Sequence, residues 1–360
     1  MGDMTEKKES PQLDQPGERV EGALPTGGEG ALPTSGEGTL PAGGEGVLPT
    51  GVVKAICISD IRGIEKRAIE EGHFLVDFGI EGDAHGGNWH RQVSLLSYDK
   101  VKAFNERGAD VGDGAFGENL VVEGLDFRAL PVGTKLYAGT VELVMTQIGK
   151  ECHSHCAIYK RMGECIMPRE GVFAKVLKEG VIRPGDEMRI ELPKEDRPFT
   201  AAVITLSDKG ARGERKDESG PAAREMLEQA GYEVVETLLI PDEPALLKTQ
   251  LMRLADGRQV DLILTSGGTG FSLRDQTPEA TLAVADRNAP GIAEAIRYKS
   301  LQITDRAMLS RGASVIRKKT LIVNLPGSPK AVKESLGFIM DSLEHGIKIL
   351  RGSASECARH

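Results

Sequence analysis

Glycines and charged residues gather in one short stretch, DLILTSGGTGFSLRDQTPEA, at residues 261–280. An apolar run leads directly into three glycines, and an arginine and an aspartate follow them. The glycines are Gly267, Gly268 and Gly270. A plain turn needs one glycine, whereas several in succession let a backbone approach a phosphate closely. The spacing therefore predicts a phosphate-binding loop, with tight turns between strand and helix as the alternative.

Two aspartates are candidates for a metal site beside such a phosphate. Asp275 follows the glycines, where an acid would repel a phosphate unless a cation lay between them. Mg²⁺ is the cation that carboxylates and substrate phosphates commonly share. Asp242, in IPDEPALL, stands at another predicted junction of strand and helix, where an ordinary N-cap is the alternative. Ser207 and Asp208, in LSDKG, end a predicted strand and are candidate pocket residues.

A second glycine loop, LPGSP at residues 325–329, also follows a buried strand and opens a helix. Two such loops together could present backbone N–H groups to phosphates from two sides. Neither loop has the lysine of a P-loop, which disfavours a Walker-type NTPase. In the first stretch, Thr277 is predicted to be the N-cap of the next helix, with Pro278 at the first helical position.

Alternating strands and helices must position these loops. Apolar strands over TAAVITLS, YEVVETLLI, DLILTSGG and TLIVNLPG alternate with helices of about a dozen residues, which predicts parallel β/α units with both sheet faces covered. The last helix carries an apolar stripe that we assign to the core: Val332, Leu336, Ile339, Leu343, Ile347 and Leu350. We expect a doubly wound α/β domain over 199–352 that binds ligands at the carboxyl ends of its strands.

Short strands dominate the preceding part of the chain. Runs such as VVKAICI, LVVEGL and GVIRPGDEMRIEL, separated by turn signals, predict a mainly β domain over 52–192, either a compact barrel or a sandwich. One helix is expected from Tyr98 to about Arg107, with Val101 and Phe104 facing inward.

Thiols and imidazoles cluster in TQIGKECHSHCAIYKRMGEC. The members are Cys152, His153, His155, Cys156 and Cys165, with Lys150, Lys160 and Arg161 nearby. Zinc binding is one hypothesis, although the C-x2-C pairing is absent and no second Cys/His pair lies at finger spacing. Surface thiols with solvated histidines are a second. A reactive thiol whose pKa is lowered by adjacent cations is the third, and the one that we favour.

The composition disfavours several classes of partner. A net charge of −9 with acids and bases interspersed argues against nucleic acid or an anionic membrane as the main partner. No run approaches the roughly 18 apolar residues of a membrane span, and the N-terminus lacks a signal peptide's apolar core. The five cysteines then predict reduced thiols in a cytoplasm. Residues 1–51, with octads such as GALPTGGE, predict a disordered low-complexity tether, PKEDRP at 193–198 a charged linker, and 353–360 a C-terminal tail.

Long motifs in the second half carry a resemblance to a known family. ITLSDKG, DESGPA, LIPDE, TSGGTG, RDQTPEATLAVADR, LSRG and VIRKKTLIVNLPGSPKAVKE resemble the molybdopterin adenylyltransferase family of the MogA/MoaB type, over nearly all of 200–352. The resemblance implies transfer of AMP from ATP to the terminal phosphate of molybdopterin. It also implies that Asp242 and Asp275 are the catalytic acids and that the domain forms a homotrimer.

Further roles follow from that chemistry. Asp275, with Asp242, would hold Mg²⁺ on the triphosphate, because positioning and charge neutralisation dominate phosphoryl transfer. The nucleotide and pterin contacts are predicted to come from Ser207, Asp208, Thr265, Ser266, Gly267, Gly268, Thr269, Gly270, Pro326, Gly327 and Ser328.

Shorter motifs in the first half, GDAH, FGENL, TQIGKEC and GVIRPGD, resemble the MOSC domain shared with molybdenum-cofactor sulfurases. The resemblance implies a mainly β fold that binds the cofactor, with a cysteine, here Cys152, that carries sulfur as a persulfide. The additional HSHC leaves open whether Cys156 is the nucleophile or a resolving partner. Asp83, His85 and His90 are candidates to line the same pocket, with a turn and exposed imidazoles as the alternative.

Together these features predict a cytoplasmic molybdenum-cofactor biosynthesis protein with two modules. An N-terminal MOSC domain would bind, transfer or sulfurate the cofactor, and a C-terminal domain would adenylylate molybdopterin with Mg-ATP. Tethering raises the effective concentration of a product that must be passed on. The expected partners are molybdopterin, ATP, other molybdenum-cofactor biosynthesis proteins and molybdoenzymes. A non-catalytic carrier or chaperone of the cofactor is the alternative function, and tungsten is the alternative to molybdenum.

Overall fold

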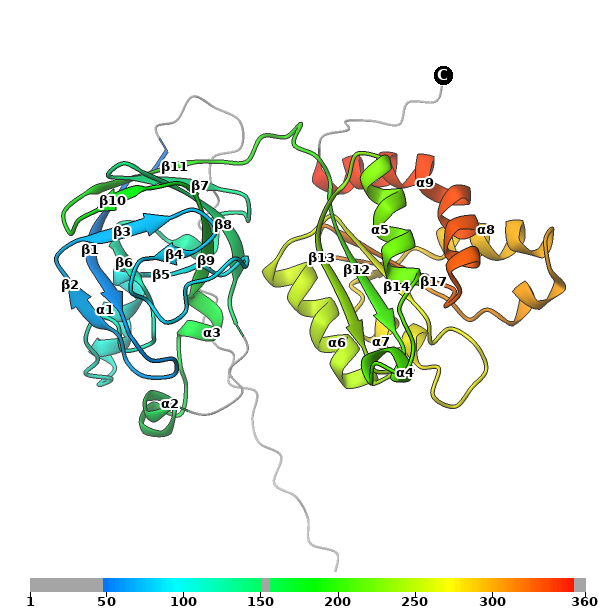
Figure 1. Ribbon diagram of the computed structural model, residues 1–360, viewed down its shortest axis with the longest axis horizontal. Coiled ribbons are helices and arrows are strands. Elements are labelled where there is room, and N and C mark those ends of the chain that lie inside the picture. Colours follow the sequence, from blue (N-terminus) through cyan, green and yellow to red (C-terminus); the bar gives the residue numbers. More distant parts are fainter. Residues whose placement is uncertain (1–47, 151–155, 353–360) are drawn as a thin grey trace, which may run out of the picture. The chain divides into compact units, whose positions relative to one another are not determined.

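A computed structural model describes residues 48–150 and 156–352 of the chain (Figure 1). Most of the expected tether, the expected tail and Cys152 lie outside the described residues. In the part that is described, no helix is long and apolar enough to cross a membrane. Three sheets organise this part, two in its first half and one in its second. The domain boundaries given above remain predictions.

Seven strands of the first half close into a barrel. In chain order these strands are β1 (Gly51–Ile58), β5 (Val93–Ser97), β6 (Leu120–Glu123), β7 (Lys135–Ala138), β8 (Val141–Ile148), β9 (Val172–Lys178) and β11 (Glu187–Glu191). An eighth strand, β2 (Arg67–Ile69), pairs with β1 outside the closed ring. Around the barrel the order is β1-β11-β7-β8-β9-β5-β6, and β6 pairs back onto β1. All of these pairings are antiparallel except β5 with β6. Of the two expected β architectures, the barrel is therefore the one that forms.

Smaller elements complete the first half. They are a three-stranded sheet of β3 (Gly72–Leu75), β4 (Gly79–Ile80) and β10 (Gly180–Ile182), and the helices α1 (Tyr98–Glu106), η1 (Phe127–Ala129), α2 (Ala157–Met162) and α3 (Met167–Glu170). The predicted helix is confirmed as α1, with Val101 and Phe104 buried. Strand β8 alternates buried and half-buried residues, because one face of a barrel strand packs on the core.

The second half is a six-stranded sheet. Its strands in chain order are β12 (Thr200–Leu206), β13 (Glu233–Ile240), β14 (Leu262–Ser266), β15 (Arg287–Asn288), β16 (Ser314–Arg317) and β17 (Thr320–Leu325). Their order across the sheet is β13-β12-β14-β17-β16-β15. The first four are parallel, as predicted, and β15 and β16 form an antiparallel edge that the sequence did not predict. The strand order reverses between β12 and β14.

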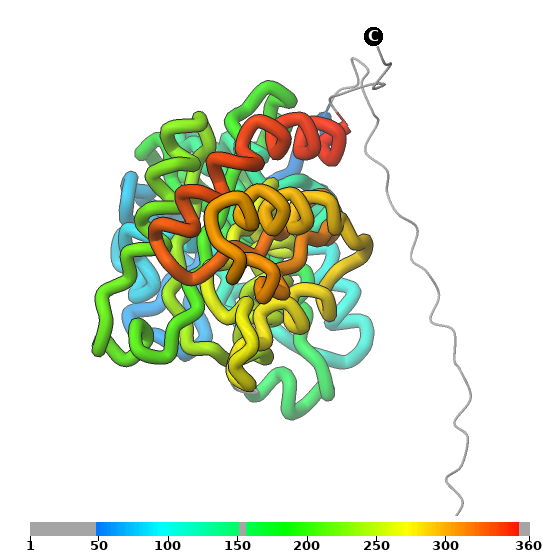
Figure 2. The backbone as a smooth tube through the Cα atoms, turned by 90° about the vertical axis from the view of Figure 1, so that its right-hand side faces the viewer, coloured from blue at the N-terminus to red at the C-terminus, as the bar shows by residue number. Residues whose placement is uncertain are grey.

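Helices cover both faces of this sheet, which is why β14 is buried along its whole length (Figure 1). The helices are α4 (Asp208–Ala211), α5 (Ser219–Gln229), α6 (Pro244–Met252), η2 (Arg253–Gly257), α7 (Thr277–Ala283), α8 (Pro290–Leu301), η3 (Asp305–Leu309) and α9 (Pro329–Arg351). One core joins α5, α8 and α9 to the sheet, and another joins α6, η2 and α7 to its opposite face. Figure 2 shows the first layer from the side of α8 and α9. The predicted stripe of α9 lies in the first core, with Leu350 only half-buried.

The C-terminal part of the predicted linker is hydrogen-bonded to the end of α9. Arg351 donates to the carbonyl oxygens of Arg197 (2.9 Å) and Pro198 (3.0 Å). The same guanidinium donates to both carboxylate oxygens of Asp261, each at 2.7 Å. Residues 197 and 198 are thus fixed to the α/β sheet.

Candidate active site

Four loops carry the predicted residues to one edge of the sheet. The carboxyl ends of the parallel strands β13, β12, β14 and β17 lie side by side there. The loops that follow these strands contain Asp242, Asp208, residues 267–270 and residues 326–328, respectively. This edge includes the point where the strand order reverses, which is the usual ligand site of an open α/β sheet.

Asp208 and Asp242 form a hydrogen-bonded pair between neighbouring strands. The backbone N–H of Asp208 donates to the Asp242 carboxylate (3.0 Å), and the N–H of Asp242 donates to the Asp208 carboxylate (3.1 Å). Arg274 Nη2 donates to both oxygens of Asp208 (2.9 Å each) and to Glu243 (3.1 Å). The pair therefore holds two carboxylates at the edge with one guanidinium as counter-ion.

The pKa values of the two carboxyl groups of this pair are shifted in opposite directions. Burial raises the pKa of Asp242, and the nearby carboxylates of Asp208 and Asp275 raise it further. The hydrogen bond from the Asp242 N–H lowers the pKa of Asp208, and Arg274 lowers it further. A cation bound beside Asp242 would reverse the effect of those neighbouring charges. The electrostatic environment of Asp242 thus favours a positive ligand.

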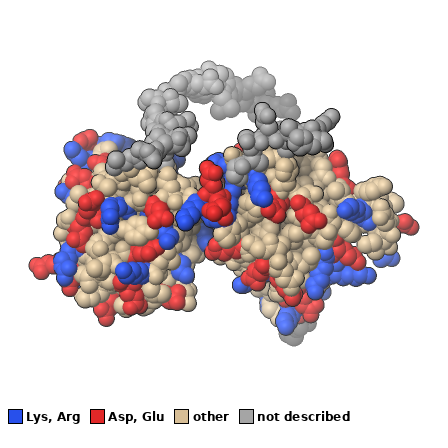
Figure 3. Space-filling view, turned by 90° about the horizontal axis from the view of Figure 1, so that it is seen from above, with Lys and Arg blue, Asp and Glu red and all other residues tan. Residues whose placement is uncertain are grey.

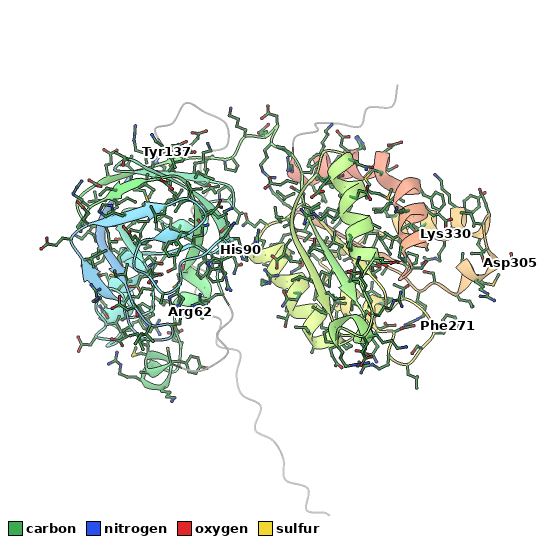
Figure 4. All side chains as sticks on the ribbon, viewed as in Figure 1. Arg62, His90, Tyr137, Phe271, Asp305 and Lys330 are labelled. Atoms are coloured by element: carbon green, nitrogen blue, oxygen red, sulfur yellow. The ribbon has the colours of Figure 1, made fainter. Side chains whose placement is uncertain are left out.

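Arg311 holds the loop that contains Asp275 at both ends. Its Nε donates to the carbonyl oxygen of Gly270 (2.7 Å), and its Nη2 donates to the carbonyl oxygen of Asp275. The Arg311 N–H donates to the carbonyl oxygen of Thr269 (2.9 Å). Between the two ends Phe271 is 68% exposed (Figure 4). Arg311 lies in the LSRG motif, and the sequence alone assigned it no role, since its partners are about 40 residues away.

The two glycine loops present backbone donors and touch each other. The N–H groups that have no acceptor within 48–150 and 156–352 include those of Gly268, Thr269, Gly270, Gly327 and Ser328. Gly267 and Gly268 have φ values of +106° and +63°, a conformation that side chains other than hydrogen disfavour. A Cβ on Gly327 would stand 3.3 Å from the Gly267 Cα. Such a cluster of amides suits an anion.

Three predicted contact residues have hydroxyl groups engaged within the protein. Thr265 is fully buried and accepts from Asn324 (2.8 Å). Ser266 donates to the Pro326 carbonyl oxygen (2.9 Å), which joins the two glycine loops. The Ser207 hydroxyl caps α4. These side chains position the loops, and direct contact with a ligand remains a prediction.

Thr277 is not the N-cap that the sequence predicts. The N-cap of α7 is Gln276, and Thr277 is the first helical residue. Its N–H donates to the Gly268 carbonyl oxygen (3.1 Å), and its hydroxyl makes no capping hydrogen bond. Thr277 is attached to the glycine loop through this N–H, and its hydroxyl lies beside Gly268, which explains why it does not cap α7.

A cavity of about 270 Å³ is bordered by the two glycine loops and by α8, η3 and α9. The residues that line it include Thr269, Gly270, Arg297, Ser300, Thr304, Pro326, Ala331 and Glu334. A cavity of about 150 Å³ holds a benzene ring, so this one is large enough for a small heterocycle. The glycine loop therefore borders this cavity through Thr269 and Gly270 and the acid pair through Gly268.

The carboxylates fit a metal that is shared with a ligand. No group of three or more His, Cys, Asp or Glu side chains that could hold a metal occurs in the part of the chain that the structure describes. Mg²⁺ bound to substrate phosphates usually takes only one or two carboxylates and keeps several waters. Oxygen donors such as Asp242 and Asp275 match that requirement. Cys152, His153 and His155 of the zinc hypothesis lie outside the described residues.

The barrel has a cavity of its own, of about 580 Å³. Its lining includes His85, Trp89, Arg91, Ser94, Phe116, Asn119, Lys150, Cys156, Cys165, Met167 and Phe173. Of the three candidates from the sequence, only His85 is among these residues. His90 instead bonds to Gln147 (2.9 Å between Nε2 and Oε1).

Asp83 is buried in a charge network. Its carboxylate accepts from Lys66 Nζ (2.9 Å), with both side chains 1% exposed, and from Asn119 Nδ2 (3.2 Å). Asn119 also donates to the Cys57 carbonyl oxygen (3.0 Å). The GDAH and FGENL motifs thus supply a buried hydrogen-bond network. Asp83 does not line the cavity because Lys66 occupies its carboxylate.

Two buried nitrogen atoms near this cavity, His85 Nδ1 and Arg91 Nε, make no hydrogen bond to the described residues, although His85 Nδ1 lies 3.8 Å from the Asp83 carboxylate. Cys156 is exposed at the start of α2. Cys57 is fully buried, and burial raises the pKa of its thiol to about 12, so it stays protonated. The cavity therefore offers nitrogen donors and an accessible thiol.

Acidic and basic side chains are interspersed over the face shown in Figure 3, in keeping with the net charge of −9. Anion binding is thus a property of local sites.

Comparison with known proteins identifies both halves. The family described as "Probable molybdopterin binding domain" matches residues 202–345, and the MOSC domain family matches residues 81–189. Molybdopterin adenylyltransferase of Escherichia coli K12 is 45% identical over 152 residues, which are 40% of this chain and 77% of the relative. The Haemophilus influenzae enzyme of the same name is 46% identical over 141 residues, 39% of this chain and 72% of the relative.

Among solved structures, the molybdopterin biosynthesis enzyme MoaB of Thermus thermophilus is 47% identical, with a TM-score of 0.41, and the match covers 43% of this chain and 97% of that chain. Each of the two bacterial enzymes is matched over more than two thirds of its length. The range 202–345 of the family match includes the loops that carry the acid pair and the glycines. The chain therefore belongs to the molybdopterin adenylyltransferase family and carries a MOSC domain in its first half.

Proposed function

We propose that the α/β part of this protein transfers the adenylyl group of ATP to molybdopterin. The observation that carries the proposal is the juxtaposition of amides and acids at the sheet edge. A Cβ on Gly268 would stand 3.5 Å from Asp242 Oδ1, so the acid lies directly beside the acceptor-free amides. Amides bind phosphate oxygens, and the adjacent acids require a cation there, which is the combination that a metal-bound triphosphate satisfies.

The reaction is an in-line displacement at the α-phosphorus of ATP. An oxygen of the terminal phosphate of molybdopterin forms the new P–O bond, the bond to the β-phosphate oxygen breaks, and pyrophosphate leaves with the electron pair. The N–H groups of residues 268–270 hold the triphosphate, and those of Gly327 and Ser328 hold the phosphate of molybdopterin. Asp242 and Asp275 would hold Mg²⁺, which neutralises the phosphate charge when bound. The protein thus supplies position and electrostatics.

Product formation tests the proposal. Wild-type protein is mixed with molybdopterin, ATP and Mg²⁺, and adenylylated molybdopterin is followed by chromatography. We expect product from the wild type and from Cys152→Ser, whereas Asp275→Ala should lose roughly 100-fold or more in rate. A wild type that binds molybdopterin but forms no product would favour the alternative function, a carrier or chaperone of the cofactor.

We also propose that the barrel cavity binds the cofactor or its molybdopterin precursor. His85 Nδ1 and Arg91 Nε support this, because both are buried without a hydrogen bond to the described residues and oxygen atoms of an anionic or carbonyl-rich ligand would supply one. Titration of molybdopterin into the full chain should then reveal two sites, and Arg91→Met should leave one. Lys54→Met, a change of an exposed lysine that is paired with Glu123, should leave both. A single site in the wild type would contradict this role.

Several finer features belong to the same proposal. Cys152 is the proposed sulfur carrier, and a mass increase of one sulfur atom at Cys152 after treatment with a sulfur donor would support it. A homotrimer through the α/β part, a cytoplasmic location, and exchange with other molybdenum-cofactor biosynthesis proteins and molybdoenzymes are likewise proposed. Sedimentation of the purified chain tests the first of these.

A further inference from the structure

The hydroxyl of Thr277 is a buried polar group without a structural partner. Thr277 is 2% exposed, and its Oγ1 makes no hydrogen bond to any described residue. The hydroxyl does not cap α7, because Gln276 occupies the N-cap position and Thr277 is the first helical residue. Burial of a hydroxyl without a partner lowers stability, so such a group in a native protein requires an explanation.

The position of this hydroxyl relates it to the acids and the glycine loop. A Cβ on Gly268 would stand 2.3 Å from Thr277 Oγ1 and 3.5 Å from Asp242 Oδ1, so both oxygen atoms flank one point beside the loop. Thr277, Asp242 and Arg274 also line a common crevice. The crevice has no space for a water molecule, so water does not satisfy the hydroxyl.

Arg274 forms one wall of this crevice. Its side chain is 54% exposed and is held by Asp208 and Glu243. Exposed ion pairs of this kind contribute little stability. A divalent cation competes with the guanidinium for Asp208, and a polyphosphate competes with Asp208 for the guanidinium. A metal-bound triphosphate would therefore draw Arg274 aside and open the crevice to Thr277.

We propose that Thr277 contacts the nucleotide directly, its hydroxyl donating to a non-bridging oxygen of the triphosphate that the amides of residues 268–270 hold. This inference rests on the proposed function, because ATP supplies the triphosphate. An O–H group that donates to an anionic oxygen forms a short, strong hydrogen bond. The free protein thus keeps a donor unsatisfied until the ligand arrives.

A purely structural role for Thr277 gives a different expectation. If only the methyl group mattered, valine would replace threonine with no loss of binding. Removal of an unsatisfied hydroxyl by an isosteric methyl is neutral or stabilising for the free protein. From our proposal we therefore expect Thr277→Val to have a melting temperature that is no lower than that of the wild type and a clearly lower affinity for the nucleotide.

The experiment uses the full chain with Mg²⁺ and α,β-methylene-ATP, an analogue that cannot transfer its adenylyl group. Calorimetric titration gives the dissociation constant, and thermal unfolding without ligand gives the stability. The variants are Thr277→Val, Thr277→Ser and, as matched control, Ser335→Ala. Ser335 is 1% exposed and its hydroxyl is also without a partner, but it lies on α9 in the core.

We expect Thr277→Val to bind at least about tenfold more weakly, and the serine and control variants to stay within about threefold of the wild type. Thr277→Val binding within about threefold of the wild type would overturn the inference. If Thr277→Val also melts lower, Thr277→Ser decides: wild-type affinity supports the inference, and weak binding overturns it. Adenylyl transfer is measured in parallel. A wild type that binds the analogue but forms no product refutes the proposed function without affecting the test of Thr277.

Discussion

Asp208 and Asp242 each accept the backbone N–H of the other, over 3.0 and 3.1 Å. This exchange joins the ends of β12 and β13, which are neighbours in the sheet. Each acid thereby fixes the backbone that carries its partner. Because Asp242 lies beside Gly268, the exchange also sets the distance between the carboxylates and the phosphate-binding amides.

The exchange predicts a difference between two substitutions of Asp208. Asparagine keeps an oxygen that can accept the Asp242 N–H, so the geometry survives while the charge is lost. Alanine loses both. We expect Asp208→Ala to lower kcat/KM for adenylyl transfer by about 100-fold and Asp208→Asn by roughly tenfold. Equal losses in steady-state assays would show that the hydrogen bond does not position Asp242.

The raised pKa of Asp242 predicts a pH-dependent stability. The folded state favours the protonated acid, so ionisation of Asp242 lowers the free energy of unfolding as the pH rises from the ordinary value of 3.8 through the raised pKa. Asp242→Asn cannot ionise and is spared that loss. In metal-free thermal melts, the stability of the variant minus that of the wild type should therefore be larger at pH 7 than at pH 4. A stability difference that is the same at both pH values would contradict this.

Arg274 should compete with Mg²⁺ for the acid pair in the absence of nucleotide. Arg274→Ala removes the guanidinium from Asp208, so titration with MgCl₂ should show binding that is tighter by up to about fivefold. Arg224→Ala is the matched control, because Arg224 is also exposed but is paired with Glu228 on α5. Weaker Mg²⁺ binding in Arg274→Ala would mean that Arg274 supports the site instead.

Gly268→Ala should destabilise the fold. Its φ of +63° costs a side chain about 1–2 kcal/mol, and the new Cβ would stand 2.3 Å from the Thr277 hydroxyl. Gly337→Ala is the control, since Gly337 lies within α9 with open space around it, and alanine there should stabilise by about 0.5–1 kcal/mol. Urea unfolding measures both. The free energy of unfolding should fall in the first variant and rise in the second, and a change of the same sign in both would contradict this explanation.

In the barrel, Lys66→Met should be strongly destabilising. It leaves the Asp83 carboxylate buried without its ion partner, which costs about 3–5 kcal/mol in comparable cases. Lys54→Met breaks an exposed pair with Glu123 and should change the free energy of unfolding by less than about 1 kcal/mol. Chemical denaturation of both variants distinguishes the two environments. A small effect at Lys66 would indicate that Asp83 becomes protonated when its partner is lost.

The sequence predicted those elements whose burial produces a recognisable apolar pattern along the chain. Parallel strands covered on both faces are continuous apolar runs, so β12 and β14 could be located within a residue or two. The edge strands β15 and β16 are short and partly exposed, and they carry no such signal. The seven-stranded closure of the barrel depends on the pairing of β1 with β11, which are far apart in the chain.

The candidate site was predicted by residue type but not by geometry. Aspartates and glycines at strand ends indicated a metal-phosphate site, and the fold brings their loops to one edge. The pairing of Asp83 with Lys66 could not be predicted, because nothing in the sequence shows that both charges are buried. Thr277 begins α7 and donates its N–H to the Gly268 carbonyl oxygen, whereas capping preferences alone predict that it is the N-cap.

Arg311 anchors Gly270 and Asp275 through hydrogen bonds to their carbonyl oxygens, and these bonds need no ligand. The chain between these residues therefore loses conformational entropy during folding, and that loss is not repeated when a ligand binds. A residue that need not touch the nucleotide thus contributes to its affinity by preorganisation. The contribution of Arg311 to affinity appears in the entropy of nucleotide association. This contribution depends on the stability of the fold as well as on the ligand.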